Sequence, residues 1–121
     1  MAALKINIDK PKAREFEING VTVEINPMDA ALVQTVYDAR QEMQKIAQLI
    51  TPDDPSGIAA LRALAYDTAV AVLGHDHTVE IWPEGCPGEY EAVQMLNWLA
   101  YMQQIGRAAI YAEYAPKRIE K

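Results

Sequence analysis

The sequence contains a single cysteine, Cys86, among its 121 residues. One cysteine cannot form a disulfide within the chain, and this usage fits a reducing compartment. A chain of this length can bury a sizeable core without disulfide or metal support. We therefore expect a single domain over residues 1–121, with a β-rich part at 3–26, a helical part at 27–115 and a flexible tail at 116–121.

Basic residues are also scarce. The sequence has 11 Lys and Arg against 17 Asp and Glu, which gives a net charge of −6. Neutralising nucleic-acid phosphates requires clustered Lys and Arg. The only such clusters are short, KPKAR at 10–14 and KRIEK at 117–121, so we expect no nucleic-acid partner.

Long apolar runs are absent as well. No window approaches the roughly 18 uninterrupted apolar residues of a membrane-spanning helix. The opening residues, MAALKINIDK, contain no apolar region of the kind found in signal peptides. We expect a cytoplasmic protein with no membrane partner.

Histidine occurs only at positions 75 and 77, within LGHDHTVEIWPEGCPGEY at residues 73–90. A His-x-His pair suits zinc when it lies on a strand, because both side chains then point to one face, but further ligands must come from elsewhere. A metal site would therefore use His75 and His77 together with some of Cys86, Glu80, Glu84 and Glu89.

The same stretch can instead connect two helices, and we favour this interpretation. Gly74 suits the end of a helix, Val79 and Ile81 alternate as a short extended piece, and the Pro/Gly-rich residues 83–88 turn the chain. Cys86 could pair with a histidine, but Pro87 follows it and the sequence indicates no helix N-terminus or oxyanion arrangement there. No phosphate-binding motif occurs. We expect a protein that is not an enzyme and binds no cofactor.

Apolar residues alternate with polar ones on both sides of Asn19-Gly20, over residues 16–25. This dipeptide between alternating runs is typical of a β-hairpin with a type I′ turn. The predicted register places Ile18 opposite Val21. Alternation also predicts a strand at Leu4–Ile8.

Two helices are predicted next. The first covers residues 27–50, with Asn26 as the N-cap and Pro27 at the first helical position. The second begins at Pro55 with Asp54 as its cap and ends at Gly74, and its many small apolar residues permit close helix packing.

The last predicted helix runs from Glu89 to Tyr114. Its middle, MLNWLAYMQQI, is apolar all round the circumference. Such a helix is either the core helix of a compact domain or also meets another subunit. The expected fold is α+β and mostly helical, with an N-terminal hairpin of two or three strands packed on three helices.

The order of these elements resembles that of the small tail assembly chaperones of long-tailed bacteriophages, in the form found in phages and prophages of Gram-positive bacteria. A hairpin, FEINGVTVEINPMDA, leads into a long helix, and a second helix closes in DTAVAVLGHDHTVEIW before the final helix. Leu73-Gly74 matches the aliphatic-Gly pair that closes the family's second helix, and Ile81-Trp82 matches its apolar loop residue.

The resemblance implies a non-enzymatic role in the host bacterial cytoplasm. The partners would be the phage tape-measure and tail-tube proteins, and the chain would form a homo-oligomer. The alternatives are another phage structural component, such as a tail-completion or head–tail connector protein, and a small metal-binding domain that uses His75 and His77.

A protein that works by association presents side chains that bury a large area at low entropic cost, and aromatic residues meet that need best. The expected partner or oligomer contacts are Trp82 in the loop and Tyr101, Ile105, Tyr111 and Tyr114 on the last helix.

Overall fold

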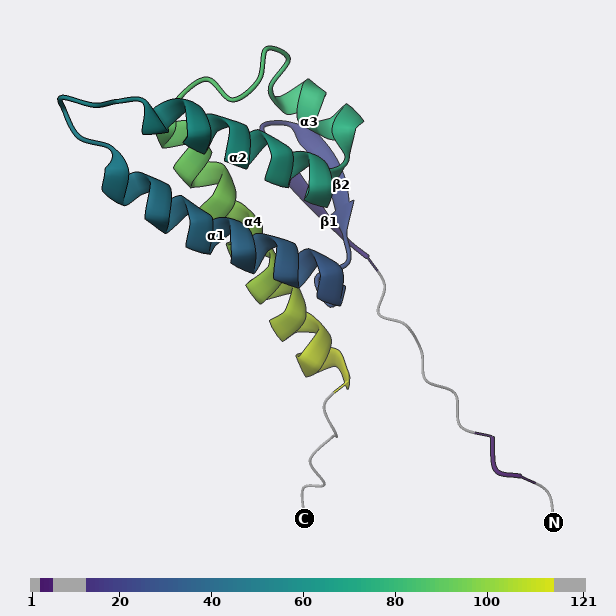
Figure 1. Cartoon of the computed structure of the whole chain (residues 1–121). Helices are drawn as coiled ribbons and strands as arrows, with labels where there is room; N and C mark the ends of the chain where they lie inside the picture. The colour runs from purple at the N-terminus through teal and green to yellow at the C-terminus, as the bar shows by residue number, and fades with distance from the viewer. Residues whose placement is uncertain (1–2, 6–12, 115–121) are drawn as a thin grey trace.

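The computed structural model describes residues 3–5 and 13–114. Figure 1 shows a two-stranded hairpin beside a group of helices. The elements are β1 (Arg14–Ile18), β2 (Val21–Ile25), α1 (Ala30–Leu49), α2 (Gly57–Leu73), α3 (His75–Ile81) and α4 (Glu89–Tyr114). The fold is α+β and mostly helical, as predicted, and α4 has the bounds expected from the sequence.

The hairpin has the predicted register. β1 and β2 pair antiparallel with Ile18 opposite Val21, next to the turn. Asn19 and Gly20 both have positive φ, at 50° and 81°, as a type I′ turn requires. Val23 is buried in the core, so the apolar face of the hairpin packs against the helices.

The strand predicted at Leu4–Ile8 lies mostly outside the described residues. Ala3–Lys5 are described, and they form no regular secondary structure. The Leu4 side chain is 92% exposed. This large apolar side chain has no contact with the core of the same chain.

Both predicted helix starts in the N-terminal half were wrong by a few residues. α1 is capped by Asp29, whose carboxylate accepts hydrogen bonds from the backbone N–H groups of Ala31 and Leu32. The Asn26 side chain accepts from the Met28 N–H instead and closes the preceding turn. A carboxylate that satisfies two free N–H groups outcompetes the earlier amide cap.

The second helix likewise starts later than Pro55. Its N-cap is Ser56, and Asp54 stabilises the turn before it by accepting hydrogen bonds from the Ser56 N–H and hydroxyl. These bonds lower the pKa of Asp54 below its ordinary value of 3.8. The carboxylate therefore favours a local turn over a helix cap.

The extended piece predicted around Val79 and Ile81 was wrong, because this segment forms the helix α3. Gly74 ends α2 with a φ of 92° that favours glycine. Its carbonyl then accepts hydrogen bonds from the N–H and the hydroxyl of Thr78, which starts the next turn of helix. Alternation over three residues was too short to distinguish a strand from one or two helical turns.

The core lies where α2 meets α1 and α4. Figure 1 shows α1 and α2 side by side, with α4 crossing behind them. Leu61 and Ala65 of α2 and Leu96 and Leu99 of α4 are fully buried. β2 packs against α2 and α3. Among the described helices, none is both long and apolar enough to span a membrane.

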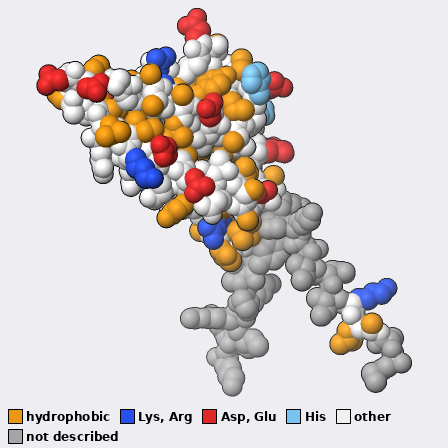
Figure 2. Space-filling model, in the orientation of Figure 1, with side chains coloured by type: hydrophobic (Ala, Val, Ile, Leu, Met, Phe, Trp, Pro, Cys, Tyr) orange, Lys and Arg blue, Asp and Glu red, His pale blue; other side chains and the backbone are white. Residues whose placement is uncertain are grey.

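The face in Figure 2 carries scattered carboxylates around apolar side chains, and the histidines lie at the end occupied by α3. Few Lys or Arg side chains interrupt this face.

Candidate protein-binding surface

One side of α4 exposes large apolar side chains. Trp98, Tyr101 and Ile105 are spaced three and four residues apart, so they share one side of the helix. Trp98 is 53% and Tyr101 52% exposed. Their ring centroids lie 5.6 Å apart at an interplanar angle of 81°, an edge-to-face pair. We call Tyr90, Trp98, Tyr101 and Ile105 the α4 stripe.

The five predicted contact residues fall into three groups. Tyr101, Ile105 and Tyr111 are exposed on α4. Trp82 is buried, with only 8% of its surface exposed. Tyr114 belongs to α4, but its side chain lies outside the described part of the structure.

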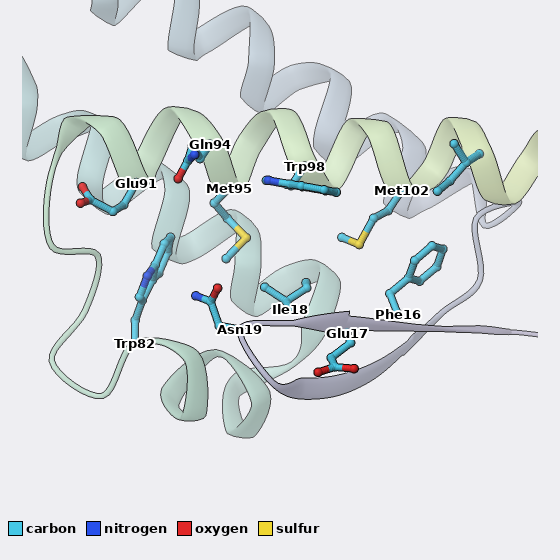
Figure 3. A pocket seen from close by; sticks show the side chains of 11 residues that line it. Phe16, Glu17, Ile18, Asn19, Trp82, Glu91, Gln94, Met95, Trp98 and Met102 are labelled. Atoms are coloured by element: carbon cyan, nitrogen blue, oxygen red, sulfur yellow. The ribbon is translucent and has the colours of Figure 1, made fainter.

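Trp82 is fixed by the end of α3 rather than carried on a free loop. Its N–H donates to the Thr78 carbonyl at 2.8 Å, and its own carbonyl accepts from the Gly85 N–H at 3.1 Å. The indole forms one end of a pocket between β1 and α4 (Figure 3). Because the indole is buried, a ligand inside the pocket can contact it, whereas the flat surface of a partner protein cannot.

This pocket has a volume of about 250 Å³, and seven of its eleven lining residues are apolar. Figure 3 shows the Met95 and Met102 side chains pointing from α4 toward the hairpin, while the Trp98 ring lies along α4. The apolar lining side chains that matter here are Phe16, Ile18, Trp82, Met95, Trp98 and Met102. Methionine side chains adapt their shape to what they contact, so such a lining can receive apolar side chains of different outline.

The charged residues that line the pocket are both acidic. Glu91 lies near Trp82, and Glu17 lies on β1. The Glu17 carboxylate points away from α4 in Figure 3, which places its main chain at the pocket wall. No Lys or Arg within residues 13–114 lines the pocket. An apolar pocket with an acidic margin favours a partner that carries apolar and basic side chains together.

The structure does not support the metal site proposed for His75 and His77. On the helix α3, residues two apart point to nearly opposite sides, whereas a strand would have placed them together. His75 is exposed, and its Nδ1 atom lies 3.6 Å from Asp76 Oδ1. The Nδ1 atom of His77 is buried and has no hydrogen-bond partner among the residues that the structure describes. Among the described residues, no three His, Cys, Asp or Glu side chains form a group that could hold a metal ion.

Cys86 is a buried structural residue. Its thiol donates to the Gly88 carbonyl at 3.4 Å, and its carbonyl accepts from Arg62 Nε at 2.7 Å. Burial raises the pKa of the Cys86 thiol above its ordinary value of 9.0, and the Glu91 carboxylate adds to the rise. A protonated, buried thiol is a poor nucleophile and a poor metal ligand.

A second groove of about 220 Å³ lies between α1 and α4. Arg40, Arg107 and several glutamines line it together with apolar side chains. Gln103 is 6% exposed, and its Nε2 atom has no hydrogen-bond partner within the described part of the chain. Water can satisfy such a group in a groove that polar side chains line, so we assign no ligand to it.

Sequence reasoning identified Tyr101 and Ile105 but left out Trp98 and the hairpin side of the pocket. The spacing of Trp98 with Tyr101 and Ile105 was visible in the sequence. The approach of Phe16 and Ile18 to α4 joins segments about 80 residues apart, and no local pattern predicts such a contact.

Searches of protein-family models, of curated proteins and of solved structures found no match to this chain.

Proposed function

We propose that this protein is a tail assembly chaperone of long-tailed bacteriophages that binds the tape-measure and tail-tube proteins. It acts in the host bacterial cytoplasm and catalyses no reaction. The order of elements is the first support, since a hairpin, a long helix, a helix ending at Leu73-Gly74 and a final helix resemble the pattern of that family, with α3 in place of the expected loop.

The observation that carries the proposal is the α4 stripe. Three of its members are aromatic, and two of these, Trp98 and Tyr101, form an edge-to-face pair that is about half exposed. Exposed aromatic side chains that already pack on one another lose little freedom on binding, which makes them effective interface anchors. A stripe on one helix also suits reversible association, because only a limited area becomes buried.

The chemistry of the described residues is compatible with a binding protein. Cys86 is held protonated by burial. The histidines diverge on α3, and no described cluster of ligands surrounds them. The surfaces that stand out are apolar or acidic, which suits binding a protein with apolar and basic side chains.

Co-purification tests the proposal. The tagged chain is expressed with the tape-measure and tail-tube proteins of the phage or prophage that the proposal implies, and the recovered proteins are identified by mass spectrometry. We expect the tape-measure protein to be retained by the native chain and lost with the double variant Trp98→Ala/Tyr101→Ala.

Tyr37→Ala provides the matched control, since Tyr37 is a similarly exposed tyrosine, at 59%, on the different helix α1. It should retain the partner as the native chain does. If neither protein co-purifies with the native chain, the proposed function is wrong. If the double variant binds as well as the control, the function does not use the α4 stripe.

A further inference from the structure

The hairpin presents an open edge beside the apolar pocket. In a two-residue hairpin the pair next to the turn, here Ile18 and Val21, exchanges backbone hydrogen bonds, and alternate pairs do the same. The backbone groups of Glu15 and Glu17 therefore point away from β2. Within residues 13–114, no backbone hydrogen bond joins either residue to another element.

An unpaired edge next to an apolar pocket is suited to the addition of an extended segment. Such a segment would form backbone hydrogen bonds with Glu15 and Glu17. Its alternate side chains would lie on the same face as Phe16 and Ile18, which line the pocket. Because Glu17 carries a negative charge, the residue of the added segment that lies opposite it should be basic.

The chain itself contains a sequence with these properties. Leu4, Ile6 and Ile8 are apolar at alternate positions, and Lys5 and Asn7 lie between them. Leu4 is 92% exposed, so the described chain leaves this apolar side chain in water while its own pocket remains open.

One antiparallel register matches every requirement. It sets Leu4 opposite Ile18 and Ile6 opposite Phe16, which directs both apolar side chains to the pocket face. The same register sets Lys5 opposite Glu17, a cross-strand pair of opposite charge. A shift by one residue would turn Leu4 and Ile6 to the opposite face of β1, which carries Glu15 and Glu17.

We propose that residues 4–8 of a second copy of this chain add to β1 as a third strand and fill the pocket between β1 and α4. The exchange is reciprocal, because each copy offers one segment and one pocket, and it therefore forms a closed twofold dimer. The inference rests on the homo-oligomer part of the proposed function and names its contact surface.

Disulfide trapping tests the contact and its register. In a Cys86→Ser background, Leu4→Cys is combined with Ile18→Cys, because opposed residues of a pair without backbone hydrogen bonds lie close enough to be bridged. After mild oxidation, we expect a covalent dimer on a non-reducing gel. Lys5→Cys with Ile18→Cys is the register control and should give at least tenfold less dimer.

The other outcomes overturn the inference. A disulfide within one chain, which leaves a covalent monomer, means that the segment fills its own pocket. Absence of any disulfide, in protein whose circular dichroism is native, means that the segment does not dock. Equal trapping in the control means that the register is wrong.

A charge exchange provides a second measurement without cysteines. Lys5→Glu and Glu17→Lys should each raise the dimer dissociation constant about threefold, in keeping with a partly exposed ion pair. The double variant should restore the native value in sedimentation experiments at low salt. Additive weakening in the double variant would contradict the pairing.

Failure here can be separated from failure of the proposed function. Tyr101 does not line the pocket, so Tyr101→Ala should weaken binding of the tape-measure protein and leave disulfide trapping unchanged. If no disulfide forms but the tape-measure protein still binds, the strand exchange is wrong and the proposed function stands.

Discussion

Gly106 of α4 packs against the ring of Pro27, so closely that a Cβ atom on residue 106 would lie 2.7 Å from Pro27 Cγ. This contact joins the turn before α1 to the last helix. Pro27, which the sequence placed at the first position of α1, lies in that turn and is fully buried. Glycine at 106 is therefore required by the approach of another segment and not by its backbone angles.

Gly106→Ala should destabilise the fold. The added methyl group meets a rigid ring, and overpacking of this kind costs about 1–3 kcal/mol, partly offset by the gain of about 1 kcal/mol in helix propensity. We expect a net loss of up to about 2 kcal/mol in urea unfolding. Gly88→Ala is the control, because its Cβ would meet only the carboxylate end of the flexible Glu91 side chain. A loss as large for Gly88→Ala as for Gly106→Ala would contradict this explanation.

Truncation of two adjacent residues of α4 should destabilise the fold by different amounts. Leu99 is fully buried, so Leu99→Ala should lower the free energy of unfolding by about 2–5 kcal/mol. Trp98 is half exposed, so Trp98→Ala should cost about 1 kcal/mol or less. Thermal and urea unfolding measure both. If Trp98→Ala unfolds the protein, Trp98 is a core residue and the α4 stripe is not a binding surface.

Local patterns explain why much of this fold was predictable. The Asn19-Gly20 turn and its register follow from short-range backbone preferences, as do the ends of α4 next to Gly88 and Pro116. The all-round apolar middle of α4 fitted either a core helix or one that also meets another subunit, and the structure exposes Trp98, Tyr101 and Ile105.

The remaining features depend on contacts that sequence patterns do not contain. α3 was missed because a strand and a two-turn helix differ little over seven residues. Trp82 was expected on a loop, and the turn stabilised by Thr78 and Gly85 buries it instead. The pocket exists only because the hairpin and α4 meet in space.

Stability should depend on pH through Cys86. Because burial raises the pKa of this thiol, the folded protein resists its ionisation while the unfolded chain ionises near 9.0. The protonated thiol therefore contributes its full share to the stability of the fold below pH 9.0, and this share is lost as the pH rises above that value. We expect the native protein to lose stability more steeply than Cys86→Ala as the pH rises above about 9. Urea midpoints that fall in parallel for both proteins would show that the thiol is not shielded in solution.

Metal content distinguishes the binding protein from a metal-binding domain. Since His75 and His77 diverge on α3, protein purified with zinc and then dialysed should retain far less than one zinc per chain. Elemental analysis gives this ratio. Stoichiometric zinc that disappears in His77→Ala would overturn the structural assignment of the histidines.

The most direct measurement of the central claim is the affinity of the purified chain for the tape-measure protein by isothermal titration calorimetry. If the α4 stripe binds the partner, Tyr101→Ala should raise the dissociation constant about thirtyfold, the effect of losing a contact worth about 2 kcal/mol. Tyr37→Ala should leave it unchanged. Equal affinities for native protein and Tyr101→Ala, with both variants folded, would contradict the claim.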